Sequence, residues 1–235
     1  MNAHRKSNNR ACLIDRGQEQ HSERIQPDYC GHSARSSGPS NEQKMAEFTS
    51  SQDGRWIEGI PPANVRLGTG TLVSGELAFK RFHSQHPEAL SIGAQCTMDR
   101  VQFALGEHGR VTIGDFSYFT NAVILCELQV EIGRFVVIGW NTTIADSDFH
   151  PLAPAERIAD AIACSPLGTG RPRPPIEAHP VVIEDDVWIG PNATILKGVR
   201  IGAGAWVEPG AMILRDIPAN ARVLGNPALV VGRTR

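Results

Sequence analysis

The chain has 235 residues, of which 41% are hydrophobic and 20% are charged, and its formal net charge at pH 7 is -2. This composition allows one globular domain, and the balanced charge argues against a nucleic-acid surface, which needs clustered Lys and Arg. No apolar run approaches the ~18 residues of a membrane helix and no secretory signal is evident, so we expect a cytoplasmic protein without membrane contacts. The five cysteines are scattered and odd in number, which predicts reduced thiols.

The N-terminal segment, residues 1–55, is rich in Ser, Asn, Gln, Arg and Gly and has no sustained apolar period. Such a segment buries too little apolar surface to offset the entropy of ordering, so we expect a disordered tail before a folded domain of residues 56–235. Met45 offers an alternative start, which leads to the hypothesis that residues 1–44 are dispensable or not made. The Cys and His residues of this tail match none of the common zinc-binding spacings: Cys12, His21, Cys30 and His32.

From residue 67 onward the sequence carries a repeat of six residues. In its C-terminal part an apolar residue recurs at every sixth position, and the residue four places further on is also small or aliphatic. Two matched columns of this kind predict the inward-facing positions of a solenoid. The first column is Ile183, Ile189, Ile195, Ile201, Val207 and Ile213, and the second is Val187, Ala193, Val199, Ala205, Ala211 and Ile217.

The same period continues upstream in groups of three. Three hexads form one triangular coil, so the groups predict an all-β fold, a parallel β-helix of about six coils whose strands pair about 4.8 Å apart. One coil cannot bury its inward side chains alone, so stacked Ile and Val columns supply the core, and an inward Ile changed to Asp should unfold several coils. The upstream groups are Leu67, Val73 and Phe79; Ile92, Met98 and Ala104; Ile113, Phe119 and Leu125; and Ile132, Ile138 and Ile144. A glycine follows the inward residue at many corners, where a tight turn gains from the absent Cβ: Gly68, Gly93, Gly114, Gly133, Gly139, Gly190 and Gly202.

Three interruptions break the repeat, near residues 80–91, 105–112 and 150–180. The third contains five prolines that break any strand ladder, while Ala155–Cys164 favours a short helix. A loop of this length inside a compact domain is often functional, so we expect it to protrude and to contribute to a site. A C-terminal tail is expected at residues 217–235.

With these columns and glycines, the chain from about residue 65 to its end resembles the hexapeptide-repeat, or isoleucine-patch, acyltransferases. The most specific stretch is Val181–Val231, which is similar to the C-terminal coils of galactoside, maltose and xenobiotic acetyltransferases. It includes Trp188-Ile189-Gly190 and the closing Gly225-Asn226-Pro227-Ala228. The resemblance implies a left-handed β-helix and transfer of an acetyl group from acetyl-CoA to a hydroxyl, or an amine, of a small-molecule or sugar acceptor. It also implies a homotrimer with active sites between neighbouring subunits, where the 150–180 loop shapes the acceptor pocket.

His150 is the predicted catalytic residue. In the family a His precedes the long loop, and here Asp146-Ser147-Asp148-Phe149-His150-Pro151 occupies that place. The count agrees, because residue 150 falls six after Ile144, where the next inward residue is due. An imidazole with a reference pKa of about 6.5 can remove a proton from a hydroxyl near neutral pH. The alternative interpretation is that His150 only caps the corner beside Pro151.

A neutral imidazole base needs its other ring nitrogen held by a carboxylate or carbonyl. Three acidic residues are candidates for this role: Asp146, Asp148 and Glu127. Asp148 lies two residues from His150 and Glu127 about one coil below, and each of these acids can equally be a solvated corner carboxylate.

The resemblance also assigns binding residues. Aligned backwards from Ile132-Gly133, Asn121 takes the place of an acceptor-binding asparagine, although Asn is also a common corner residue. For acetyl-CoA, the resemblance implies backbone hydrogen bonds to the pantetheine arm, an indole contact near the thiol and positive charge at the nucleotide end. The residues concerned are Gly190, Gly202 and Ala203 for the arm, Trp188 for the thiol end, and Arg215 with Arg222 and Arg233 for the phosphates. Leu229 stands where the sugar acetyltransferases often carry Arg, and Trp188 can alternatively cover the outside of a coil.

Two other functions fit the same repeat. A zinc-dependent carbonic anhydrase on this type of prism would need two His five residues apart, but His150 and His179 are 29 residues apart, so we expect no metal. A non-catalytic scaffold is the second alternative, and His150 argues against it. A covalent route through Cys164 is disfavoured because its proline-rich loop offers no evident base.

Overall fold

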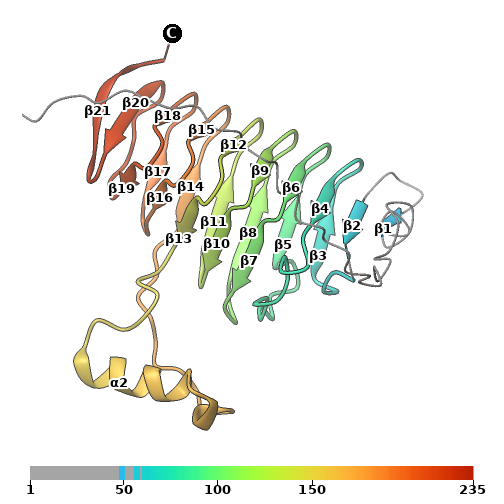
Figure 1. Ribbon diagram of the computed structural model, residues 1–235, viewed down its shortest axis with the longest axis vertical. Coiled ribbons are helices and arrows are strands. Elements are labelled where there is room, and N and C mark those ends of the chain that lie inside the picture. Colours follow the sequence, from blue (N-terminus) through green and yellow to red (C-terminus); the bar gives the residue numbers. More distant parts are fainter. Residues whose placement is uncertain (1–47, 51–55, 59, 235) are drawn as a thin grey trace, which may run out of the picture. The chain divides into compact units, whose positions relative to one another are not determined.

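The computed structural model describes residues 48–50, 56–58 and 60–234, which form a parallel β-solenoid interrupted by a segment with one α-helix. Strands of two to six residues alternate with corners, and each strand pairs with the equivalent strand of the next turn (Figure 1). The stack makes about seven turns. The predicted parallel β-helix is therefore confirmed, with about seven turns where about six coils were expected.

The turns stack into three sheets, which we call the long, the six-stranded and the five-stranded sheet. All pairs are parallel except β1–β2 and β20–β21, which are antiparallel. The long sheet contains, in spatial order, β1 (Phe48–Ser50), β2 (Trp56–Glu58), β4 (Leu72–Ser74), β6 (Thr97–Asp99), β9 (Tyr118–Thr120), β12 (Val137–Ile138), β15 (Trp188–Ile189), β18 (Trp206–Val207), β20 (Ala221–Gly225) and β21 (Ala228–Arg233). The six-stranded sheet contains β3 (Val65–Leu67), β5 (Leu90–Ile92), β8 (Arg110–Ile113), β11 (Gln129–Ile132), β14 (Val181–Ile183) and β17 (Arg200–Ile201). The five-stranded sheet contains β7 (Gln102–Leu105), β10 (Val123–Cys126), β13 (Thr143–Ala145), β16 (Thr194–Ile195) and β19 (Met212–Ile213).

Each turn passes through three corners. Corner 1 leads from the six-stranded sheet to the long sheet, corner 2 from the long to the five-stranded sheet, and corner 3 from the five-stranded sheet back to the six-stranded sheet. Residues with positive φ make the bends, for example Phe135 at corner 1 and Asn141 at corner 2. The glycines that follow inward residues serve another purpose, since a Cβ on Gly190 would lie 2.6 Å from the backbone nitrogen of Pro209 in the next turn. These glycines allow close stacking of turns rather than an unusual φ.

The core is the stack of inward side chains. All six residues of the predicted Ile and Val column from Ile183 to Ile213 are buried, as expected. The predicted register was wrong at two positions, because Ala104 and Leu125 were expected inward and the structure buries Phe103 and Ile124 instead. At these two turns corner 2 is one residue shorter, so the inward spacing falls from six to five.

The long interruption is present but begins earlier than residue 150. The chain leaves β13 after Ala145 and returns to the stack at β14, and we call residues 146–180 the excursion. It contains α2 (Pro154–Ala163), which confirms the predicted helix with bounds shifted by one residue, and the 3-10 helix η1 (Pro166–Gly168). Pro154 starts α2, where a missing N–H costs no helical hydrogen bond. Figure 1 shows α2 apart from the three sheets, joined to the stack by two connecting segments, one from β13 and one to β14.

The predicted shorter interruptions are turns between strands. Residues 106–109 link β7 to β8, and the segment between β4 and β5 includes a parallel bridge from Phe82 to Leu105. The predicted C-terminal tail contains the β20–β21 hairpin.

Most of the predicted disordered segment 1–55 lies outside the described residues, together with its Cys and His residues and Met45, although β1 falls within it. Among the described residues, no helix is long and apolar enough to cross a membrane.

Candidate active site

The excursion brings His150 against a buried carboxylate. The ring Nδ1 of His150 lies 2.5 Å from Oδ2 of Asp160, which is on α2 and is fully buried. The His150 side chain itself is 59% exposed. The predicted inward position for His150 is therefore wrong, because the chain has already left the solenoid and the six-residue count no longer applies.

Arg173 fixes the carboxylate of Asp160 from the other side. Its Nε donates to Oδ1 at 2.6 Å, and its Nη2 donates to Oδ2 at 3.2 Å and to the carbonyl of Phe149 at 3.1 Å. These charge-assisted bonds, with a further contribution from His150, lower the pKa of Asp160 to about 2. Asp160 is therefore ionised at neutral pH and accepts the Nδ1 hydrogen, which leaves Nε2 as the basic nitrogen of the ring.

The other acids of the sequence motif have different partners. Asp146 is fully buried, and its carboxylate accepts hydrogen bonds from the backbone N–H groups of Glu127, Leu128 and Gln129 at 2.7–2.8 Å. It fixes the turn at corner 3 of the preceding coil. The carboxylate of Asp148 lies 2.6 Å from Nζ of Lys197. The contact to the imidazole that we expected from Asp146, Asp148 or Glu127 is made in the structure by Asp160.

Glu127 lies half-buried at corner 3, within electrostatic range of the excursion. Burial raises the pKa of Glu127, while the positive charge of Arg173 opposes this rise and the carboxylates of Asp146 and Asp160 add to it. Glu127 thus shares the electrostatic environment of the Asp160–Arg173 pair.

Lys197 holds the two ends of the excursion together. Its ammonium contacts Asp148 on the outgoing segment and Glu177 on the returning segment, the latter at 3.0 Å. An isolated antiparallel bridge between Ser147 and Ala178 pairs the same two segments. Both ends of the excursion are therefore held to the solenoid at one point.

Asn121, the expected acceptor-binding residue, is at corner 2. Its side-chain nitrogen donates to Asn141 Oδ1 at 2.7 Å, and Asn141 donates in turn to Asn192 at 3.4 Å, so a ladder of Asn side chains follows this corner. The ladder gives Asn121 a structural role, which the sequence left as an alternative. His150 is at corner 3, so the structure does not bring these two residues together at one corner of the chain.

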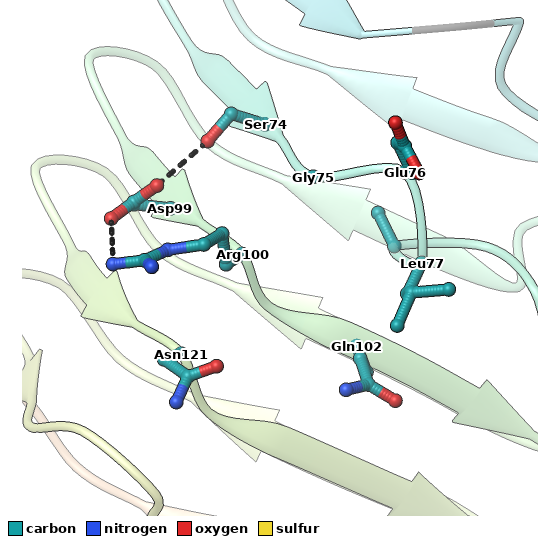
Figure 2. A pocket seen from close by; sticks show the side chains of 9 residues that line it. Ser74, Gly75, Glu76, Leu77, Asp99, Arg100, Gln102 and Asn121 are labelled. Atoms are coloured by element: carbon teal, nitrogen blue, oxygen red, sulfur yellow. Dashed lines mark hydrogen bonds and ion pairs between the residues drawn. The ribbon is translucent and has the colours of Figure 1, made fainter. Parts of the chain in front are cut away.

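Asn121 also lines a cavity of about 520 Å³ at corner 2, with polar side chains from three successive turns (Figure 2). Asp99 lies between Ser74, whose hydroxyl donates to Oδ1 at 3.0 Å, and Arg100, whose Nη2 is 3.5 Å from Oδ2. The volume is in the range of small-molecule pockets. The lining residues are Ser74, Gly75, Glu76, Leu77, Ala78, Asp99, Arg100, Gln102 and Asn121.

The residues expected to bind acetyl-CoA have contacts within the solenoid. Trp188 stacks on Trp206 on the long sheet, with ring centroids 4.0 Å apart. The backbone N–H groups of Gly190, Gly202 and Ala203 donate to Val207, Ile217 and Glu184 at 2.8 Å, so they are not free donors for a pantetheine arm. Arg222 pairs with Glu208, and Arg215 and Leu229 are exposed. These N–H groups are thus engaged within the stack, and the coenzyme contacts expected of these residues, of Trp188 and of the arginines stay a prediction.

The described cysteines are free: Cys96, Cys126 and Cys164. Burial, and then the neighbouring Asp146, raise the pKa of the Cys126 thiol, which makes it a poor nucleophile. In the part of the chain that the structure describes, no three His, Cys, Asp or Glu side chains come together in a way that could hold a metal ion.

Comparison with known proteins adds to this geometry. The family described as "Bacterial transferase hexapeptide (six repeats)" matches residues 180–215. A 2,3,4,5-tetrahydropyridine-2,6-dicarboxylate N-acetyltransferase of Staphylococcus aureus is 58% identical over 57 residues, which is 24% of each chain. The chain thus matches about a quarter of the length of this curated relative.

Two solved structures are also similar. A hexapeptide-repeat acetyltransferase from Vibrio cholerae is 30% identical, with 60% of this chain and 70% of that chain covered and a TM-score of 0.45. The Bacillus cereus N-acyltransferase AntD, as its S84C mutant with dTDP-4-amino-4,6-dideoxyglucose and coenzyme A, is 20% identical. That comparison covers 72% of this chain and 83% of AntD at a TM-score of 0.54, a likeness of fold.

Proposed function

The chain belongs to the hexapeptide-repeat transferases, and from this we propose that it transfers an acyl group from acetyl-CoA to a hydroxyl or amino group of a small acceptor. The observation that carries the proposal is the contact of His150 with ionised Asp160, locked by Arg173. It gives a surface imidazole a fixed tautomer, which an ordinary exposed histidine lacks.

In the proposed reaction, Nδ1–H of His150 donates to Asp160, and Nε2 removes the proton from the acceptor as its oxygen or nitrogen attacks the thioester carbonyl. The resulting tetrahedral intermediate collapses, the C–S bond breaks, and the imidazolium returns its proton to the departing thiolate. Asp160 stays ionised throughout and stabilises the imidazolium, as the carboxylate of a catalytic triad does. Arg173 keeps the carboxylate in place.

A homotrimer would complete the site. His150 is at corner 3 and the cavity with Asn121 is at corner 2, so we propose that the excursion of one subunit meets the corner 2 cavity of its neighbour. Apolar side chains on the excursion, including Ile158 and Ile162 on α2, are exposed in the single chain and suit such a contact. Two similar proteins are named as an N-acetyltransferase and an N-acyltransferase, so the proposal includes amine acceptors as well as hydroxyl acceptors.

The test is release of free CoA thiol from acetyl-CoA with a panel of sugars, glycosides and amino alcohols. In a His150→Ala variant the acceptor-dependent rate should fall by a factor of about 10² to 10⁴, the usual contribution of a positioned general base. His83→Ala, which alters an exposed histidine on the turn between β4 and β5, is the matched control and should keep the wild-type rate. Equal rates for wild type and His150→Ala would remove His150 from the mechanism.

A further inference from the structure

We propose that the corner 2 cavity selects neutral or cationic acceptors rich in hydroxyl or amino groups, such as amino sugars, and discriminates against acceptors with phosphate or several carboxylate groups. The inference rests on the proposed function, with the cavity of Figure 2 as the acceptor pocket. It concerns the charge class of the acceptor, which the family assignment leaves open.

The charges that line the cavity are unevenly distributed. Glu76 and Asp99 contribute two carboxylates and Arg100 the single cation, so the lining has a formal charge of -1. Arg100 is already engaged, because its guanidinium pairs with Asp99 on the wall of the cavity. Glu76 is exposed, and among the described residues no Lys or Arg forms an ion pair with it. A negative ligand would therefore meet one uncompensated carboxylate.

The uncharged lining groups fit the same class of acceptor. Ser74, Gln102 and Asn121 present a hydroxyl and two amides, and Leu77 adds an apolar side chain (Figure 2). Carboxylates only accept hydrogen bonds, so Glu76 and Asp99 suit ligand hydroxyl and ammonium groups, which donate. Phosphate sites instead use free Arg or Lys side chains or helix N-termini, and the cavity wall is built from strands and corners.

The electric potential of the cavity can be measured without knowing the acceptor. Leu77→Cys, in a background where Cys12, Cys30 and Cys164 are changed to Ser, places a thiol in the cavity wall. The rates at which a cationic and an anionic methanethiosulfonate reagent modify this thiol are measured, and their ratio reports the local electric potential. The control is Leu214→Cys in the same background, because Leu77 and Leu214 are both 47% exposed and Leu214 lies beside one Arg and one Asp.

We expect the cation-to-anion rate ratio to be at least about threefold higher at Leu77→Cys than at Leu214→Cys in low salt, with the difference reduced at about 0.5 M salt. Adding Glu76→Gln should lower the ratio at Leu77→Cys, whereas Glu88→Gln, which removes the same charge from the Arg66 ion pair, should not. A ratio at Leu77→Cys equal to or below the control overturns the inference. Because this readout needs no catalysis, its failure is separate from a failure of the proposed function.

A kinetic experiment tests the same inference with three acceptors that share one sugar ring, namely methyl glucoside, glucosamine and glucose 6-phosphate. Thiol release from acetyl-CoA is the readout. We expect kcat/KM for the phosphate to be at least about tenfold below the better of the other two. The Glu76→Gln variant should reduce this difference in kcat/KM about threefold, while its circular dichroism spectrum stays that of the wild type. Equal use of the phosphate by the wild type would contradict the inference and leave the acyl-transfer proposal intact.

Discussion

Asp160 holds the imidazole of His150, the proposed general base, through its Nδ1 atom. We predict that Asp160→Asn lowers kcat at least about tenfold while the KM for acetyl-CoA changes little, because the amide can hold the wrong imidazole tautomer. Steady-state thiol release measures both constants. Asp148→Asn is the matched control, since this acid belongs to the same excursion but contacts Lys197. A similar loss of kcat in both variants would mean that the two acids only maintain the fold of the excursion.

The pKa of Asp160 also predicts how stability depends on pH. Its folded pKa of about 2 lies below the ordinary value of about 3.9, so its contribution is present above pH 4 and is lost as the pH falls towards 2. The melting temperature of the wild type should therefore exceed that of Asp160→Asn at pH 6, and the difference should shrink between pH 4 and pH 2. Thermal melts across this range measure it. A difference that does not change with pH would refute this role for the carboxylate.

His150 can be predicted from the sequence, but its partner Asp160 cannot. The position of His150 before a proline-rich loop is visible in the chain, whereas Asp160 is one acid among several in that loop. Its selection depends on α2 turning one face towards His150 and Arg173, which brings together residues 10 and 13 positions apart. The available signal was a single aspartate in the middle of the predicted helix.

At the scale of elements, the hexad repeat predicts the sheets because each turn buries the same column of side chains. Where the repeat misleads, at Ala104 and Leu125, the cause is a corner shortened by one residue, and the sequence there gives two apolar candidates side by side. Period alone cannot choose between adjacent apolar residues. The neighbouring strand can, since Phe103, Ile124 and Ile144 occupy equivalent positions in paired strands.

The stacked column makes a specific prediction about stability. Ile189 is fully buried between two turns, so Ile189→Ala should lower the free energy of unfolding by about 2–5 kcal/mol through lost burial and the cavity left behind. Denaturant unfolding at a fixed protein concentration measures the change. The exposed Leu229→Ala serves as control and should stay within about 0.5 kcal/mol of the wild type. A comparable loss in both variants would contradict the column as the source of stability.

At the scale of the whole molecule, the separation of His150 from the corner 2 cavity predicts complementation between subunits. His150→Ala and Asn121→Ala should each be poorly active alone. Mixed by unfolding and refolding together at equal amounts, they should regain about a quarter of the wild-type activity, because random trimers contain that share of sites with both native residues. Activity after mixing measures this, and light scattering should give the mass of three chains. No recovery in a mixed trimer would mean that each site lies within one chain.

The pairing of Ser147 with Ala178 has a consequence for how such a protein can change over time. Because the two ends of the excursion meet in one antiparallel bridge, a two-residue turn could close the gap and leave the stacked turns intact. Everything that orients the imidazole, namely Asp160 and Arg173, is carried on the inserted segment. The chain therefore separates the stacked turns, which supply the folding energy, from the segment that carries the proposed base, so exchange of one insertion between related scaffolds would transfer the proposed base together with its partners.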